Sequence, residues 1–302
     1  MSFRPRLPRG DTTILGIGLA VLSVFLFAFN NGYGKLLIQS IPAGQFVLMR
    51  SLASAVLLAP FCWRGGLAPF REAPRKGLQV VRVVFAAMEV MLFYVAVSYL
   101  PLAETLTFWL AAPIYVTALS AIFLGEKVGW RRWTAVGVGF IGVLIVMRPS
   151  TAAMSWPALF AFIGGILYSC GMTVTRAIRS TPDTVLMAGY LVGVTLIGFI
   201  SLLFDAKMPT GTEMLATTAL AIVSVAAQLF FIRSLKLAPA SVIAPYQNTT
   251  IVWGALFGFL IFGEIPDLIA VVGAAIIVAA SLYIFLRERR LGKSTVPLEP
   301  VE

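Results

Sequence analysis

The sequence predicts an all-α polytopic membrane protein with ten transmembrane helices, arranged as two inverted five-helix repeats. Three observations lead to this fold class. Of the 302 residues, 59% are apolar and only 12% are charged, whereas soluble domains are about 45–50% apolar and about 25% charged. The apolar residues fall into ten long stretches. The first five stretches and the last five share one pattern, in which a stretch that begins at a proline ends in Gly-Glu and is followed by another stretch.

Each apolar stretch is long enough to cross a bilayer, for which about 18 residues are the practical minimum. Proline, glycine and charge clusters separate the stretches. The connections between them are short, so we expect no separate domain, and any function must lie within the bundle or at its ends. We expect helices at 13–38, 43–63, 77–99, 102–124, 130–147, 156–178, 184–204, 214–236, 240–262 and 267–286.

The distribution of basic residues predicts the orientation. Most of the 23 Lys and Arg residues fall in alternate connections, which are cytoplasmic if both termini are cytoplasmic. The net charge of +10 therefore reflects topology, and we expect no nucleic-acid partner. The first stretch exceeds the length of a signal peptide and lacks a small-residue cleavage site, so we expect it to be retained.

Composition also excludes several kinds of chemistry. The chain has no histidine, so it cannot form a Ser-His-Asp or Cys-His catalytic site. Its two cysteines, Cys62 and Cys170, lie far apart in apolar stretches and are most simply interpreted as buried small residues. No G-x-x-x-x-G-K-[ST] phosphate-binding motif is present. We expect no enzyme, no metal and no cofactor, and transport driven by a gradient.

An internal repeat joins the two halves. Residues 93–126 align with residues 231–264 without a gap, at an offset of 138. Four aligned pairs are identical: Phe93 and Phe231, Pro101 and Pro239, Gly125 and Gly263, Glu126 and Glu264. Because each half has an odd number of helices, the second half is inverted. Inverted repeats are typical of alternating-access transporters with a midplane site, although a scaffold without transport is an alternative. We expect repeats at 1–150 and 151–290 and a disordered cytoplasmic tail at 291–302.

The motifs around the repeat resemble those of the EamA family. They are Tyr99–Glu104, the apolar run that ends in Gly125-Glu126, Trp130 with the glycines of the next stretch, and Phe262-Gly263-Glu264 in the second copy. Two EamA repeats make a member of the drug/metabolite transporter superfamily, and the chain is most similar to YddG-type amino-acid exporters within it.

This resemblance implies a secondary transporter in the bacterial inner membrane. It would export small amphipathic metabolites, chiefly amino acids including aromatic ones, as a monomer or weak homodimer in the lipid bilayer. A proton-coupled exporter of cationic drugs is the alternative. A membrane enzyme and a channel are disfavoured by the missing histidine and by the lack of a ring of like charges.

Glycines and prolines within the stretches predict how the helices pack and bend. Pro113 and Pro245 predict kinks in the fourth and ninth stretches, where they shape a cavity or only the packing. Glycines four residues apart predict close helix contacts, with a dimer contact as the alternative. These pairs are Gly189 with Gly193 and Gly254 with Gly258. Three glycines in the fifth stretch have the same role: Gly137, Gly139 and Gly142.

Arg50 and Glu89 are the charged residues expected near the middle of the membrane. A charge at that depth costs about 2.5–3.5 kcal/mol on insertion scales, so such residues face the bundle and have partners. We expect the two to be close enough to pair directly or through water, either as a structural ion pair or as a substrate or proton site. Lys35 and Arg82 lie nearer the ends, where they could extend to water.

Polar and aromatic residues at middle depth complete the predicted site. Buried amides and hydroxyls need partners, which a substrate with an ammonium and a carboxylate could supply, while aromatic faces would hold a ring or a cation. The resemblance implies that their helices line a central cavity. The predicted substrate-binding residues are Asn30, Glu89, Tyr94, Trp109, Tyr168, Gln228, Tyr246 and Gln247.

Overall fold

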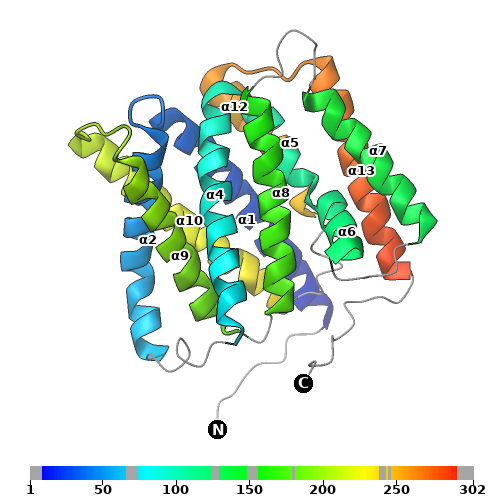
Figure 1. The fold of residues 1–302 in the computed structure, drawn as a ribbon, viewed down its shortest axis with the longest axis horizontal. Helices are drawn as coiled ribbons and strands as arrows, with labels where there is room; N and C mark the ends of the chain where they lie inside the picture. The colour runs from blue at the N-terminus through cyan, green and yellow to red at the C-terminus, as the bar shows by residue number, and fades with distance from the viewer. Residues whose placement is uncertain are drawn as a thin grey trace.

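A computed structural model describes residues 9–65, 74–123, 129–147, 156–178, 181–237, 243 and 246–290, and all regular structure in these ranges is helical (Figure 1). The first repeat contains α1 (Arg9–Leu37), α2 (Ala43–Gly65), α4 (Lys76–Tyr99), α5 (Leu102–Leu110), α6 (Ala112–Phe123) and α7 (Trp130–Met147). The second contains α8 (Trp156–Ala177), α9 (Asp183–Ser201), α10 (Gly211–Leu237), α12 (Thr250–Phe262) and α13 (Leu268–Arg290).

The helices have the lengths that a membrane requires. Within the described residues, nine helical stretches are long and apolar enough to cross a bilayer, and Thr250–Phe262 is a shorter apolar helix. This confirms the predicted fold class. Two predicted helices differ from the observed ones: the fourth is divided into α5 and α6, and in the ninth a turn at Asn248 and Thr249 separates helical residues at 246 and 247 from α12. Pro245, where a kink was predicted, lies outside the described residues. The predicted tail at 291–302 lies outside the described residues.

The two helix breaks occur at equivalent positions of the repeat. The offset of 138 residues places Ala111, between α5 and α6, on Thr249, which precedes α12. The backbone carbonyl groups of Ala111 and Thr249 each accept hydrogen bonds from the N–H groups three and four residues further on. The donors are Ile114 and Tyr115 in the first repeat and Val252 and Trp253 in the second, at 2.9–3.2 Å. Pro113 explains the first break, because proline has no N–H to continue the helix.

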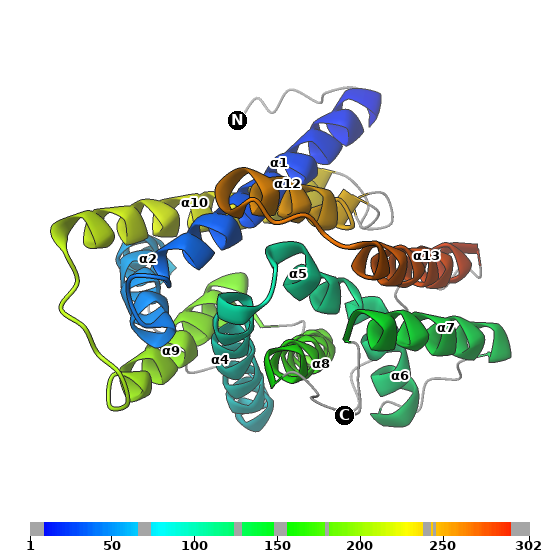
Figure 2. The same ribbon diagram turned by 90° about the horizontal axis from the view of Figure 1, so that it is seen from above.

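Helix pairing follows the inverted symmetry. The first helix of each repeat packs on the third helix of the other, so that α1 lies along α10 and α8 lies along α4. Equivalent helices also pair with each other, as α2 does with α9 and α7 with α13 (Figure 2). The largest contacts therefore join the two repeats. A rearrangement of one repeat against the other would change the interior of the bundle.

Close helix contacts depend on glycine. An added Cβ on Gly139 would lie 2.3 Å from the Ile114 side chain, and one on Gly254 would lie 2.5 Å from Leu106. The pairs Gly189–Gly193 and Gly254–Gly258 also face atoms of other helices, as Gly142 does, so the predicted packing role is confirmed for these glycines. The prediction was wrong for Gly137, which is exposed and where an added Cβ would meet no atom within 4 Å. These contacts matter because lipid supplies no hydrophobic drive for helix association, which leaves van der Waals packing as a main attraction.

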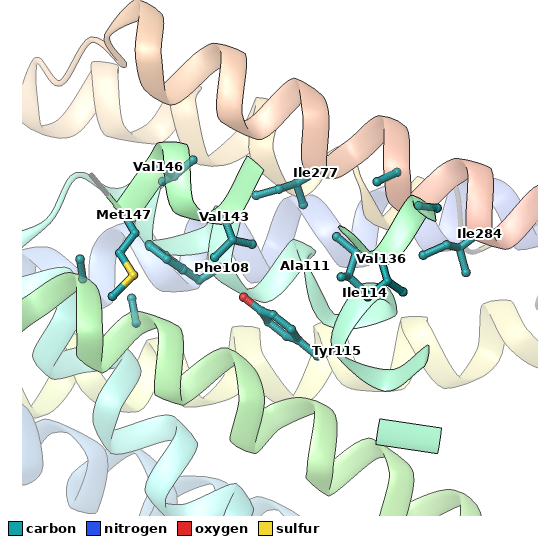
Figure 3. Close-up of a cluster of buried hydrophobic side chains, with 14 of the residues drawn as sticks. Phe108, Ala111, Ile114, Tyr115, Val136, Val143, Val146, Met147, Ile277 and Ile284 are labelled. Carbon is teal, nitrogen blue, oxygen red and sulfur yellow. The ribbon is translucent and has the colours of Figure 1, made fainter. Parts of the chain in front are cut away.

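A buried apolar cluster joins α4, α5, α6, α7, α8 and α13 (Figure 3). Its largest fully buried members include Phe108, Ile114 and Ile277. The cluster surrounds the first helix break, so the bend at Ala111 is held by packing on both repeats. Its other labelled members in Figure 3 are Tyr115, Val136, Val143, Val146, Met147 and Ile284.

Candidate functional site

Arg50 is the centre of a buried polar network. Its Nη1 atom donates one hydrogen bond to Asn30 Oδ1 at 3.0 Å and one to the Tyr94 hydroxyl at 2.9 Å. Asn30, which is 2% exposed, donates from Nδ2 to the carbonyl of Leu220 at 2.7 Å. The network therefore links α1, α2 and α4 of the first repeat to α10 of the second.

Aromatic rings surround the Arg50 guanidinium group. Its central carbon lies 5.1 Å from the centre of the Tyr94 ring and 5.6 Å from that of Phe46. Both rings are almost fully buried. At such distances an aromatic face attracts a cation by about 0.5–2 kcal/mol, more when water is absent. The rings thus help to hold an ionised side chain inside the bundle.

Glu89 has a different partner. The indole Nε1 of Trp109 donates a 2.6 Å hydrogen bond to Glu89 Oε1, which joins α4 to α5. Trp109 also approaches α8 closely, because an added Cβ on Gly164 would lie 2.7 Å from the indole ring. Glycine at that position leaves the space that Trp109 occupies.

The ring of Phe93 contacts both the tyrosine that binds Arg50 and the tryptophan that binds Glu89. Phe93 contacts Tyr94 edge-to-face at 5.1 Å between ring centres and contacts Trp109 in the same way at 5.0 Å. The direct ion pair considered for Arg50 and Glu89 is not formed among the residues that the structure describes, since each has its own partner. A contact through water stays a prediction. The arrangement is instead a cation and a carboxylate whose aromatic partners, Tyr94 and Trp109, both contact Phe93.

The other predicted residues occupy more varied positions. Tyr168 on α8 is 36% exposed and lies within electrostatic range of Glu89. Gln228 is half-buried on α10 and makes no hydrogen bond within the described part of the chain. Tyr246 and Gln247 lie at the second helix break, where their carbonyls accept hydrogen bonds from the Thr249 and Thr250 hydroxyl groups. Their substrate-binding roles stay predictions.

The sequence reasoning missed Tyr190. This residue lies on α9, packs partly buried against the cluster that contains Phe46 and Tyr94, and is within electrostatic range of Arg50 and Glu89. The signal that could have found it is a tyrosine within the largely apolar seventh stretch. Tyr190 brings the second repeat to the same central region.

Two basic residues were expected to reach water and do not. Lys35 is 6% exposed. It forms an ion pair with Glu264 and donates to the carbonyl of Leu100 at 2.8 Å. Arg82 is 8% exposed and donates to the carbonyl of Leu186 on α9. These predictions were wrong because both cations find partners from distant parts of the chain within the bundle, although Arg82 Nε is buried without a partner in the described residues.

Two inverted five-helix repeats around a buried polar centre define a polytopic transporter of the inverted-repeat class. The family model described as the EamA-like transporter family matches residues 14–148 and 155–286. The chain therefore belongs to the EamA-like transporter family.

Curated relatives are named for different substrates. A riboflavin transporter of Rhizobium johnstonii is 28% identical over 234 residues, which are 76% of this chain and 77% of the relative. The pseudopaline exporter CntI of Pseudomonas aeruginosa is 26% identical and covers 88% and 94% of the two chains. An S-adenosylmethionine uptake transporter of Rickettsia felis is 23% identical, with 92% and 95% covered. These names agree on membrane transport but not on substrate or direction.

A solved crystal structure has the same fold. It superposes with a TM-score of 0.61 at 18% identity and covers 94% of this chain and 99% of the other. At this identity the similarity shows the fold alone. The substrate must therefore be inferred from the polar centre.

Proposed function

We propose that this transporter exports small amphipathic metabolites, with amino acids, including aromatic ones, as its preferred class. The observation that carries the proposal is the presence of Arg50 and Glu89 in one interior cluster, each held by its own partner. A zwitterion has the complementary pair of charges. The rings of Tyr94, Phe93 and Trp109, which contact one another in sequence, would supply an apolar surface for a side chain.

Arg50 has hydrogen-bonding capacity left for a carboxylate. Its contacts to Asn30 and Tyr94 both use Nη1. Nε and Nη2 have no partner in the described residues, and neither is among the fully buried, unpartnered atoms. This edge of a guanidinium group matches the two oxygens of a carboxylate. Arg50 would therefore bind the carboxylate of the substrate while Asn30 and Tyr94 fix its orientation.

Glu89 would bind the ammonium group. Trp109 contacts only Oε1, which leaves Oε2 as an acceptor. The Trp109 hydrogen bond fixes the carboxylate, so little side-chain freedom is lost when substrate binds. A purely cationic drug would meet the same carboxylate but also the positive charge of Arg50. The polar centre thus favours a zwitterion over the cationic drugs of the alternative function.

Orientation and location belong to the proposal as well. The basic residues of alternate connections support cytoplasmic termini and insertion in a bacterial inner membrane. Pairing of α1 with α10 and of α4 with α8 supports alternating access, because movement of one repeat against the other changes contacts along the whole interior.

Uptake into proteoliposomes tests this function. A panel of amino acids and organic cations is supplied with and without a pH gradient, to the unaltered protein and to Arg50→Met, Glu89→Gln and Arg131→Gln. Arg131 is exposed and lies outside the polar centre, so its variant controls for loss of positive charge. We expect movement of aromatic amino acids, reduced at least tenfold in the first two variants only. Failure to move any amino acid would refute the proposal.

The same assay tests proton coupling. If Glu89 carries a proton during transport, a pH gradient accelerates uptake by the unaltered protein and has no effect on the Glu89→Gln variant. Equal rates with and without the gradient in the unaltered protein would exclude a proton role for Glu89.

A further inference from the structure

The ion pair between Lys35 and Glu264 connects distant parts of the two repeats. Lys35 is in the last turn of α1, and Glu264 follows α12, which ends at Phe262. The Lys35 side chain is 7% exposed and that of Glu264 is 22% exposed. An ion pair that is removed from water in this way is costly unless its remaining atoms are also satisfied.

The remaining atoms of the pair bind a third segment. Lys35 Nζ donates to the carbonyl of Leu100 at 2.8 Å, and Glu264 Oε2 accepts from the N–H of Leu102 at 2.9 Å. Leu100 and Leu102 flank the connection between α4 and α5. Two side chains thus hold together the end of α1, the α4–α5 connection and the α12–α13 connection.

Two glycines place the Glu264 carboxylate. Gly263 has φ +67°, a left-handed conformation that glycine adopts without strain, and it ends α12 so that the chain reverses. An added Cβ on Gly258 would lie only 3.2 Å from Glu264 Oε2. The Gly-Glu motif and the glycine one turn before it therefore serve one purpose, which is to turn the carboxylate back against the end of α12.

The ion pair lies beyond the polar centre, toward one end of the bundle. Asn30 and Lys35 are both on α1, five residues apart, which corresponds to about 7.5 Å along a helix. We define the Lys35 end as the end of the bundle that contains this pair, and the Arg82 end as the opposite one. At the Lys35 end, the pair and its bonds to Leu100 and Leu102 join elements of both repeats directly beyond the predicted binding residues.

We propose that the Lys35–Glu264 pair is a latch that closes the Lys35 end of the transporter, and that this end opens when the pair separates. Separation gives both charges access to water, which offsets the lost attraction between them. The latch therefore holds this end closed without trapping it, whereas loss of one partner would leave the other charge buried and unpaired, which favours opening. It depends on the transport function but not on the identity of the substrate.

Thiol labelling in lipid nanodiscs tests the latch without any substrate. Cys62 and Cys170 are replaced by serine. One reporter is Ala103→Cys, because Ala103 is 6% exposed in the first turn of α5 beside the latch. The other is Val185→Cys, because Val185 is 8% exposed near the start of α9 at the Arg82 end. Each is combined with Glu264→Gln, which keeps an acceptor for the Leu102 N–H but removes the charge.

We expect Glu264→Gln to increase the labelling rate at Ala103→Cys at least tenfold and to leave the rate at Val185→Cys unchanged or lower. Adding Lys35→Met removes the second buried charge, so labelling at Ala103→Cys should return to the slow rate of the protein with the intact pair. An unchanged rate at Ala103→Cys, or equal increases at both reporters, would overturn the latch. The uptake panel tests the amino-acid function separately.

Discussion

The Nη1 atom of Arg50 donates a 2.9 Å hydrogen bond to the Tyr94 hydroxyl, which lies on a different helix. Tyr94 is 1% exposed. Because Asn30 binds the same nitrogen and also the backbone of α10, this one bond is part of a chain of contacts between the repeats. Several measurable consequences follow from this chain and from the packing around it.

Replacing Tyr94 with phenylalanine should destabilise the protein. The ring and its contacts remain, but Arg50 loses an acceptor, and hydrogen bonds to charged groups contribute about 1.5–3 kcal/mol. Thermal unfolding of the purified protein in detergent should show a lower midpoint. Tyr283→Phe is the control, because Tyr283 on α13 is 45% exposed. Equal midpoints for Tyr94→Phe and the unaltered protein would contradict the role of this bond.

Two glycines on α8 should respond differently to alanine. At Gly164 the new Cβ would lie 2.7 Å from the Trp109 ring, whereas at Gly171 the nearest atom is 3.9 Å away. Overpacking costs about 1–3 kcal/mol, and displacement of Trp109 would also weaken its bond to Glu89. We expect Gly164→Ala to lose stability and substrate affinity and Gly171→Ala to lose neither. A larger loss in Gly171→Ala than in Gly164→Ala would contradict the packing of Trp109 against Gly164.

Tyr115 should tolerate loss of its hydroxyl. Its Oη atom is buried without a partner in the described residues, and Figure 3 shows it pointing into the apolar cluster toward Phe108. An unsatisfied buried polar group costs about 1–3 kcal/mol. Tyr115→Phe should therefore unfold at the same or a higher temperature. A clear loss of stability would mean that the hydroxyl has a partner.

The sequence predicted the fold more completely than it predicted the contacts. Hydrophobic length located the membrane helices, and Pro113 indicated the break between α5 and α6, because both features act within a few residues. The repeat offset also placed Ala111 and Thr249 at the same point. These features depend on local chemistry that a single sequence contains.

Partner choice could not be predicted in this way. Lys35 was expected to reach water, but it forms an ion pair with Glu264, which is 229 residues away in the sequence. Arg50 binds Asn30 and Tyr94 rather than Glu89 directly. Such pairs depend on which helix faces meet in three dimensions, and neither helical periodicity nor depth in the membrane determines that.

The central claim is that Arg50 binds the carboxylate of a zwitterionic substrate. Competition by L-phenylalanine and by its amide, measured on uptake by the unaltered protein and by Arg50→Met, tests it most directly. We predict that the unaltered protein prefers L-phenylalanine by roughly tenfold or more, about 1.4 kcal/mol, and that Arg50→Met removes this preference. An equal preference in both proteins would contradict the claim.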